Sequence, residues 1–318
     1  MKVIEHYERA TEPLLSYEII PPKRGGSVGQ VLEIVEALAP YDPPFIDVTS
    51  HSAEASYEEM PDGSIRRNVK RKRPGTLGLC AAIQHRFGID AVPHVLCRGF
   101  TREETEDAMI ELNYLGIHNV LAVRGDDNGV SKRQRPERTV NEYASDLVQQ
   151  IAAMNRGEYL DDGLLDASPT DFCIGVGGYP EKHEEAPNRT WDVLHLKRKV
   201  DAGADYVVTQ MFFDTAHYVD FVERCRDVGI DVPIVPGLKI ITTKRHLRSL
   251  PRTFKVEIPE SLAAEVEEAR DEHVADIGVE WARQQTEALM EAGAPGIHFY
   301  IMSTPRHVLK VVEPLRAV

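Results

Sequence analysis

The stretch "DYVVTQMFFDTAHYVDFVERCRDVG", residues 205–229, joins an apolar strand pattern directly to a helical pattern. Residues 205–213 are almost continuously apolar, which is typical of a parallel strand that is covered on both faces. Residues 215–229 carry the helical pattern and end in glycine, which often caps a helix at its carboxyl end. We therefore predict one β-strand followed by one α-helix here.

The same alternation of strand and helix runs through the whole chain. Seven further strand patterns occur, at residues 14–20, 45–50, 91–97, 118–124, 171–178, 232–238 and 296–302. Helical patterns lie between them, at residues 26–39, 101–116 and 188–203, and Thr101 with Glu104 forms a capping-box pattern. Eight strands that each precede a helical segment are what a (β/α)8 barrel requires. We predict an α/β fold, a single (β/α)8 TIM barrel that forms one catalytic domain over residues 1–318.

A doubly wound sheet is the main alternative fold. Dinucleotide-binding sheets of that class carry G-x-G-x-x-G after the first strand, and this chain has no such motif there. The partial match "GVGG", residues 175–178, lies in the wrong part of the chain. The barrel is therefore favoured.

Composition and charge narrow the function classes. Hydrophobic residues make up 42% and charged residues 28%, close to globular averages, and the net charge of −14 disfavours a dedicated nucleic-acid binder. The one basic run, "RRNVKRKR" at 66–73, is expected to be a solvated face or a subunit contact. No apolar run approaches the roughly 20 residues that span a membrane. The four cysteines are scattered without a C-x-x-C pair and no signal-peptide pattern is visible, so we expect a cytoplasmic protein.

Polar residues gather where the predicted strands end, which is where barrel enzymes place their active sites. Glu18 stands out because it lies in the apolar stretch "SYEIIPPK", residues 16–23. A buried, unpaired carboxylate shifts its pKa and takes up a proton, so this position suits a protonatable carboxyl group. The other strand-end groups are Thr49, His94, Arg124, Asp126, Tyr179, His183, Gln210, His298 and Tyr300. Their convergence on one face of a barrel favours an active site.

Each candidate also has a purely structural interpretation. Glu18 could be ion-paired, His94 could be a satisfied core histidine, and Asp126 could cap the next segment. Gln210 is harder to explain in that way, because a buried amide needs partners for its donors and its acceptor. Metal-dependent hydrolysis is disfavoured because the histidines lack H-x-H or H-E-x-x-H spacing, and we predict no metal site. A serine nucleophile is disfavoured too, since no G-x-S-x-G elbow occurs.

Several blocks, above all "SYEIIPPK", "GVGGYPEKHEEA" and "LKRKVDAGADYVVTQMFFD", together resemble the 5,10-methylenetetrahydrofolate reductase family. The resemblance covers nearly the whole chain. It implies an FAD-containing (β/α)8 barrel that reduces 5,10-methylenetetrahydrofolate to 5-methyltetrahydrofolate, with NADH or NADPH as electron donor. The two substrates would use one site in turn, in one-carbon metabolism and methionine supply. It also implies a homo-oligomer, either a dimer or a tetramer.

The resemblance assigns roles to residues at matching positions. Glu18 matches the general acid that protonates the folate and opens its methylene bridge. Asp126 matches a carboxylate near the flavin and pterin rings, where it affects folate binding and flavin potential, and Gln210 matches an amide that hydrogen-bonds the substrate. The positions that match FAD contacts are Thr49, His94, Arg124, Gly125, Asp126, Tyr143, Ala144, Asp146, Tyr179, His183, Asp192, Arg198 and Lys199.

The chain also departs from the family pattern. Residues 48–52 read "VTSHS", where the family usually has "VTYGA" or "VTWGA", so an aromatic residue and a glycine beside the flavin are replaced. An aromatic residue that covers the nicotinamide or folate in some members is replaced near Leu250. Two alternatives stay open: another flavin-dependent barrel oxidoreductase resembling proline dehydrogenase, and a non-catalytic protein that binds folate or flavin.

Overall fold

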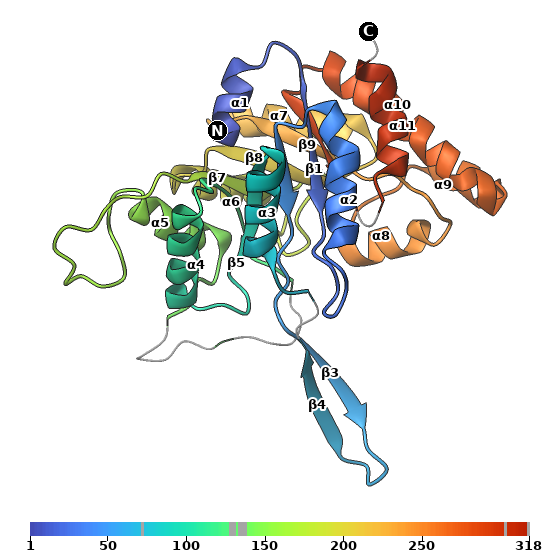
Figure 1. The fold of residues 1–318 in the computed structure, drawn as a ribbon. Coiled ribbons are helices and arrows are strands. Elements are labelled where there is room, and N and C mark those ends of the chain that lie inside the picture. The colour runs from blue at the N-terminus through green and yellow to red at the C-terminus, as the bar shows by residue number, and fades with distance from the viewer. Residues whose placement is uncertain (71–72, 127–131, 133–138, 302–303, 317–318) are drawn as a thin grey trace.

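Eight parallel strands close into a barrel at the centre of the molecule (Figure 1). The computed structural model describes residues 1–70, 73–126, 132, 139–301 and 304–316. Around the barrel the strand order is β1-β10-β9-β8-β7-β6-β5-β2. The strands are β1 (Leu14–Ile19), β2 (Phe45–Val48), β5 (Asp90–Leu96), β6 (Asn119–Val123), β7 (Cys173–Gly178), β8 (Tyr206–Met211), β9 (Ile234–Leu238) and β10 (Gly296–Tyr300). The predicted (β/α)8 barrel is confirmed, and each strand lies where the apolar runs placed it.

Helices surround the barrel, and most of them cover the outer faces of its strands (Figure 1). They are α1 (Val3–Arg9), α2 (Gly29–Leu38), α3 (Thr76–Phe87), α4 (Arg102–Tyr114), α5 (Ala144–Met154), α6 (Arg189–Asp201), α7 (Thr215–Asp227), α8 (His246–Phe254), α9 (Glu260–Glu268), α10 (Val274–Glu291) and α11 (Arg306–Arg316). Short 3-10 turns occur at Ala39–Tyr41 and Asp271–His273. None of the described helices has the length and apolar character needed to cross a membrane.

The capping box predicted for α4 forms as expected. The Thr101 Oγ1 accepts a hydrogen bond from the Glu104 backbone N–H at 3.1 Å, and the Thr101 N–H donates to Glu104 Oε2 at 2.9 Å. These two bonds satisfy donors that a helix start otherwise leaves unpaired. The box fixes the first residue of α4, immediately after the loop that leaves β5 at the carboxyl end of the barrel.

Alternation along each strand separates the outer core from the barrel interior. Tyr17, Val48 and Phe299 belong to the large core cluster that also contains the helix residues Leu38 and Val311. The smaller cluster inside the barrel contains Phe45, Val92, Leu121, Tyr206 and Val208, together with Val3 of α1. The strand residues that pack against helices point outward, so the strand residues that alternate with them point into the barrel. This parity directs the polar residues Ser16, Glu18, Asp47 and His298 into the barrel.

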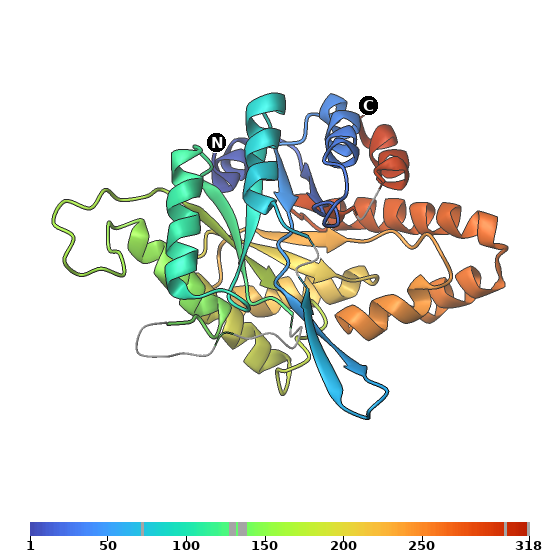
Figure 2. The same ribbon diagram turned by 60° about the horizontal axis from the view of Figure 1, so that its bottom comes forward.

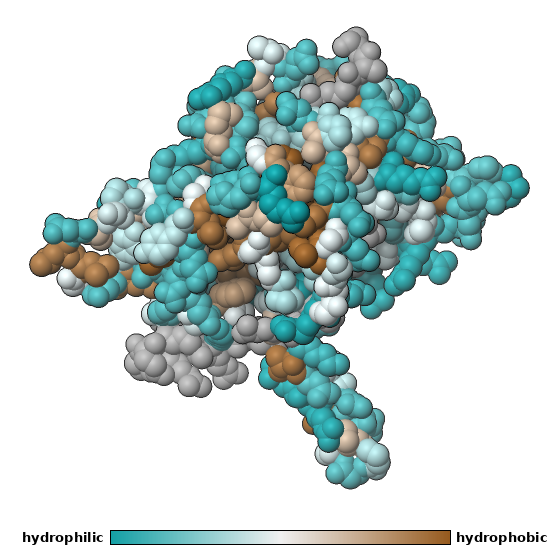
Figure 3. Space-filling view, viewed as in Figure 1, coloured by the Kyte–Doolittle hydropathy of each residue, from teal (hydrophilic) through white to brown (hydrophobic). Residues whose placement is uncertain are grey.

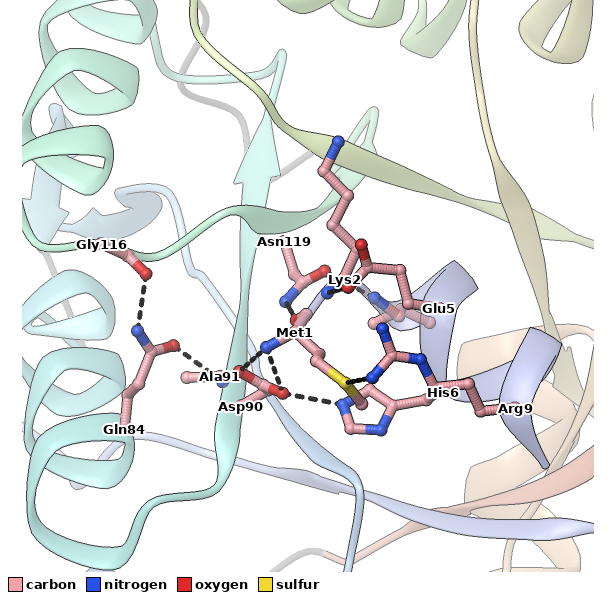
Figure 4. A network of polar contacts seen from close by, with 11 residues as sticks. Met1, Lys2, Glu5, His6, Arg9, Gln84, Asp90, Ala91, Gly116 and Asn119 are labelled. Atoms are coloured by element: carbon pink, nitrogen blue, oxygen red, sulfur yellow. Dashed lines mark hydrogen bonds and ion pairs between the residues drawn. The ribbon is translucent and has the colours of Figure 1, made fainter.

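The amino-terminal segment closes the end of the barrel opposite the strand carboxyl ends (Figure 4). The Met1 ammonium donates to both carboxylate oxygens of Asp90 at 2.8 Å, and His6 Nε2 lies 2.7 Å from Asp90 Oδ2. Asn119 accepts from the Val3 N–H at 2.8 Å and donates to the Met1 carbonyl at 2.9 Å. These contacts hold α1 across the amino ends of β5 and β6, so the barrel opens only toward its carboxyl end.

A β-hairpin that the sequence patterns do not predict leaves the barrel after β2. Its strands β3 (Glu54–Glu59) and β4 (Ile65–Lys70) pair antiparallel and extend away from the barrel (Figure 2). Figure 3 shows the hairpin as mostly hydrophilic. Residues 66–70 of the basic run form β4 and are largely exposed, in keeping with the expected solvated face. Residues 71–72 of that run lie outside the described part of the chain.

Candidate active site

Three titratable side chains meet inside the barrel, near the carboxyl ends of neighbouring strands. Glu18 of β1, Asp47 of β2 and His94 of β5 have side chains that are only 15%, 0% and 9% exposed. His94 Nε2 lies 3.5 Å from Glu18 Oε2 and also 3.5 Å from Asp47 Oδ2. Parallel pairing of β1 with β2 and of β2 with β5 brings these three residues together from distant parts of the sequence.

Burial makes Glu18 a carboxyl group that can hold a proton near neutrality. Loss of solvent raises the pKa of Glu18 to about 7; His94 opposes this rise and Asp47 adds to it. For His94, burial by itself lowers the pKa, but the Asp47 and Glu18 carboxylates outweigh burial, so the pKa of His94 is raised. The structure therefore points Glu18 inward, in the protonatable state that the sequence predicts for it.

Lys239 and Asp47 are site residues that the sequence analysis missed. Lys239 follows β9, and its Nζ donates to the Tyr300 carbonyl at 2.8 Å. Burial lowers the pKa of Lys239 to about 8, while the Glu18 charge opposes that change. A charged residue within or directly after an apolar strand, as in "FIDV" and "PGLK", is the signal that could have found both.

Deeper in the barrel, His298 is a buried neutral histidine. Its Nδ1 lies 2.9 Å from Ser16 Oγ, and burial lowers the pKa of His298 to about 4. The next inward residue of β10, Tyr300, donates from its hydroxyl to the Thr209 carbonyl at 2.5 Å. Of these two predicted strand-end groups, His298 pairs with Ser16 and lies beneath Glu18, whereas Tyr300 pairs with Glu18 itself and lies at the same level of the barrel.

Gln210 of β8 lies beside a small hollow at the rim of the barrel. Its Oε1 accepts from the Met211 N–H at 2.9 Å. No hydrogen bond of its Nε2 is found within the described ranges, so this N–H2 group can serve a ligand. Tyr179, Glu181 and Phe254 line the same hollow, and burial raises the pKa of Glu181 to about 7.

An aromatic residue, Phe254, lies four residues after Leu250, the position near which the family's aromatic residue is replaced. Leu250 itself is buried in a cluster with Met211 and Phe213 and offers no face to a ligand. Phe254, at the end of α8, is 36% exposed and lines the hollow beside Gln210. An exposed ring at this place can stack on a flat ligand.

A larger cavity, of about 420 Å³, lies between the carboxyl ends of β6 and β7 and the helices α5 and α6. Most residues that the family resemblance assigns to FAD line it. They are Arg124, Tyr143, Ala144, Tyr179, His183, Asp192, Arg198 and Lys199. The structure thus brings together in one cavity residues spread over more than seventy positions of the chain.

Fixed polar contacts organise this cavity. Arg124 makes a two-point ion pair with Glu185, with N–O distances of 2.7 and 2.5 Å. Asp192 accepts from the His183 N–H at 2.9 Å, which anchors the loop after β7 to α6. Lys199 donates to the Gly177 carbonyl, and burial lowers the pKa of Lys199 to about 8, although Asp192 opposes that change. The arginine and lysine give the cavity the character of an anion-binding site.

Gly177 leaves room at the wall of this cavity. A Cβ at Gly177 would meet no atom within 4 Å, whereas one at Gly175 would lie 2.4 Å from the Tyr206 ring. Two of the three glycines of "GVGG" are therefore explained by different structural requirements. Gly175 allows close packing inside the barrel, and Gly177 keeps the cavity wall flat and open.

The remaining predicted flavin contacts lie outside the wall of this cavity. Gly125 has a φ of +82°, which turns the chain after β6 and presents Asp126 at the exposed mouth. Burial lowers the pKa of His51 and raises the pKa of Tyr179; the Asp126 charge opposes the first change and adds to the second. Asp126 thus lies within electrostatic reach of both the hairpin base and the cavity.

Asp146 and Thr49 are placed differently from the cavity residues. Asp146 Oδ2 accepts from the Tyr143 N–H at 2.9 Å, so this carboxylate caps the start of α5. Thr49 follows β2, and its carbonyl accepts from Thr76 Oγ1 at 2.9 Å. The Thr49 hydroxyl is buried and has no hydrogen-bond partner within the described part of the chain. It lies one residue beyond β2, on the rim that also carries Glu18.

Comparison with known proteins places the chain in a family. A family model described as methylenetetrahydrofolate reductase matches residues 2–316. The chain belongs to the methylenetetrahydrofolate reductase family. It is 29% identical to methylenetetrahydrofolate reductase (NADH) 1 of Arabidopsis thaliana, over 99% of this chain and 51% of that protein. It is 31% identical to 5,10-methylenetetrahydrofolate reductase of Salmonella typhimurium, over 91% of this chain and 86% of that protein.

The chain spans about half the length of the plant methylenetetrahydrofolate reductase. Among solved structures, a Clostridium thermocellum protein described as binding two copies of 5-methyl-5,6,7,8-tetrahydrofolic acid superposes with a TM-score of 0.59. The match covers 97% of this chain and 96% of that one at 12% identity, so it shows a shared fold. Within the described ranges, no group of three or more His, Cys, Asp or Glu side chains could hold a metal ion.

Proposed function

We propose that this protein reduces 5,10-methylenetetrahydrofolate to 5-methyltetrahydrofolate with NADH or NADPH, through bound FAD, in two successive half-reactions at one site. The observation that carries the proposal is Glu18, whose pKa of about 7 and inward position suit a proton donor in a member of this family. Opening the methylene bridge of the folate needs such a donor, because the ring nitrogen leaves the bridge carbon only when it gains a proton.

The cavity of about 420 Å³ would hold the part of FAD that contains its diphosphate. Arg198 and the buried Lys199 would hold the anionic diphosphate, and the open wall at Gly177 accepts a flat group without a clash. The Thr49 hydroxyl, buried without a hydrogen-bond partner among the described residues, is available to a bound group. When bound, the flavin supplies hydride transfer, accepting from the nicotinamide and donating to the folate.

The protein's own residues would prepare the folate for reduction. Glu18 transfers its proton to the folate nitrogen, and Gln210 offers its free Nε2 donors to the pterin edge. The Phe254 ring covers the bound ligand next to Gln210. A negative charge on Asp126 disfavours further negative charge beside it, which makes the bound cofactor a stronger reductant.

An anaerobic assay of flavin colour tests the proposal. The purified protein should be yellow, NADH or NADPH should bleach it, and methylenetetrahydrofolate should then restore the colour. An amine substrate such as proline reducing the flavin would indicate a proline-dehydrogenase-like oxidoreductase instead. Binding without any colour change would indicate a non-catalytic folate or flavin protein, and a colourless protein that binds no added FAD would contradict the cofactor assignment.

Four further features remain proposals of the same kind. We propose that residues 1–318 act as one catalytic domain, that the protein is a dimer or tetramer, and that it works in the cytoplasm without a nucleic-acid partner. All four cysteines are buried free thiols, which supports a reducing compartment. Light scattering of the FAD-loaded protein would determine the oligomeric state.

A further inference from the structure

Asp47 is the one described aspartate whose side chain is fully buried inside the barrel. It is 0% exposed, and neither Oδ1 nor Oδ2 has a hydrogen-bond partner among the described residues. A carboxylate without solvent or hydrogen bonds is unstable unless a positive charge lies near it. Among the described groups, the one within ion-pair distance is His94, whose Nε2 lies 3.5 Å from Asp47 Oδ2.

The same nitrogen of His94 also faces Glu18. Its distance to Glu18 Oε2 is 3.5 Å, so a single N–H of His94 lies between two carboxyl groups. His94 Nε2 likewise has no hydrogen bond in the described part of the chain. With an exposed fraction of 9%, the His94 side chain is almost fully buried.

The surroundings leave His94 as the partner of Asp47. The titratable groups of other elements that act electrostatically on this cluster are Tyr7 of α1, His51 after β2, Cys80 of α3, Tyr206 of β8, Lys239 after β9, and His298 and Tyr300 of β10. Burial raises the pKa of the tyrosines and of Cys80, which keeps them neutral. His298 is also neutral, because burial lowers its pKa to about 4, and Lys239 is directed to the Tyr300 carbonyl.

We propose that Asp47 is a positioning residue that keeps His94 protonated beside Glu18, so that His94 returns a proton to Glu18 after each folate reduction. This inference rests on the proposed function of Glu18. In the proton balance, Glu18 gives its proton to the folate nitrogen and becomes a carboxylate. The His94 Nε2–H proton then moves to Glu18 Oε2, which leaves neutral imidazole. The imidazole regains its proton from water when product has left and the mouth is open.

The charge of His94 tests the proposal directly. The measurement is NMR of the ring nitrogens in FAD-loaded protein labelled with ¹⁵N-histidine, at pH 7. The His94 signal is assigned as the one that is lost in His94→Gln. In the wild type this signal should be that of an imidazolium. In Asp47→Asn it should show neutral imidazole, because burial then dominates. Asp90→Asn is a matched control. Asp90 lies on the same strand as His94 but at its other end, where it pairs with His6 of α1. It should leave the His94 signal unchanged.

The pH profile of the folate half-reaction provides a kinetic readout. Glu18 is pulled toward its charged form by His94 and toward its neutral form by Asp47, and the His94 effect is the larger. Loss of the imidazolium in Asp47→Asn should therefore raise the pKa of Glu18 and move the alkaline limb up by about one pH unit. The NADH half-reaction, which does not use Glu18, should keep its profile.

Three results would overturn the proposal: a neutral His94 in the wild type, a charged His94 in Asp47→Asn, or an alkaline limb that stays in place or moves down. If Asp47→Asn does not fold, Glu18→Gln decides the question. With Asp47 intact, His94 should remain an imidazolium in Glu18→Gln, and a neutral ring there would assign the charge to Glu18 alone. The NMR signal needs no folate turnover, so it separates this inference from a failure of the proposed function.

Discussion

Glu18 shows how the protein environment changes what one carboxyl group can do. In water a glutamate is ionised at neutral pH, but inside this barrel its pKa is about 7. At that value about half of the molecules carry the proton at neutral pH, so Glu18 can both donate and regain it. The apolar neighbours in "SYEII" predicted this environment from sequence alone, since they indicated burial.

Glu18→Gln tests the role of this group. The amide has nearly the same shape but does not donate an acidic proton, so the folate half-reaction should slow by about 10²–10⁴-fold. NADH-driven bleaching of the flavin should stay close to the wild-type rate. Stopped-flow measurement of each half-reaction gives the comparison, and an equal loss in both would exclude the general-acid role.

Other residues of the site could not be predicted in this way. The Asp47–His94 contact depends on the pairing of β2 with β5, which lie more than forty residues apart in sequence. A strand pattern such as "FIDV" indicates a buried strand but not which residues its polar member will face. The predicted FAD contacts rest on family resemblance. The structure adds that most of them share one cavity, whereas Asp146 caps a helix.

At the scale of elements, the sequence predicts the end of a helix well where a side chain caps the backbone N–H groups there. The start of α4 is an example, because Thr101 and Glu104 satisfy each other's backbone N–H groups. The β3–β4 hairpin is the opposite case. Tyr57, Ile65 and Val69 lie on one face of the hairpin and are all largely exposed. Ser56, Glu58 and Arg66 on the other face are exposed too, so neither face packs against the barrel. Because this segment is not buried, it does not need the alternation of apolar and polar residues from which strands are predicted.

Replacement of the α4 cap should reduce stability without changing chemistry. Thr101→Ala removes the hydroxyl acceptor and should lower the free energy of unfolding by about 1 kcal/mol. Urea denaturation measures this loss. Thr101→Ser keeps the hydroxyl and serves as the control, with a smaller expected effect. Equal stability of the alanine variant and the wild type would show that the cap contributes nothing to folding.

At the scale of the whole molecule, the two ends of the barrel have different tasks. One end is closed by the amino-terminal segment and the Asp90 network (Figure 4), which stabilise the strands. The other end carries the titratable residues and the cavity, as expected for barrels. The closed eight-stranded order was predictable because every unit repeats the same strand and helix pattern, while the network depends on side chains that meet only after closure.

Binding of FAD should stabilise the whole barrel, because the cavity proposed to hold it joins β6 and β7 to α5 and α6. At a concentration 100 times its dissociation constant, FAD should add about 2.7 kcal/mol to the free energy of unfolding. Thermal melting of flavin-free protein with and without FAD measures this effect. Riboflavin, which lacks the phosphates, should stabilise less at equal concentration, and Arg198→Ala should reduce the difference between the two ligands. Identical shifts with both ligands would show that the cations do not bind the diphosphate.

The hairpin turn has a practical consequence for following the site in solution. Its hydrogen bonds are local: Met60 donates to Ser64 at 2.8 Å, and Asp62 accepts from the Ser64 N–H at 2.9 Å. The turn is exposed and joins β3 to β4, which form a sheet separate from the barrel. A peptide inserted after Gly63 should therefore leave the pairing of the barrel strands intact. Arg73 at the base of the hairpin donates to the Pro21 carbonyl, in the loop that follows β1. A fluorophore carried by such an insertion would therefore report ligand binding that moves the base of the hairpin.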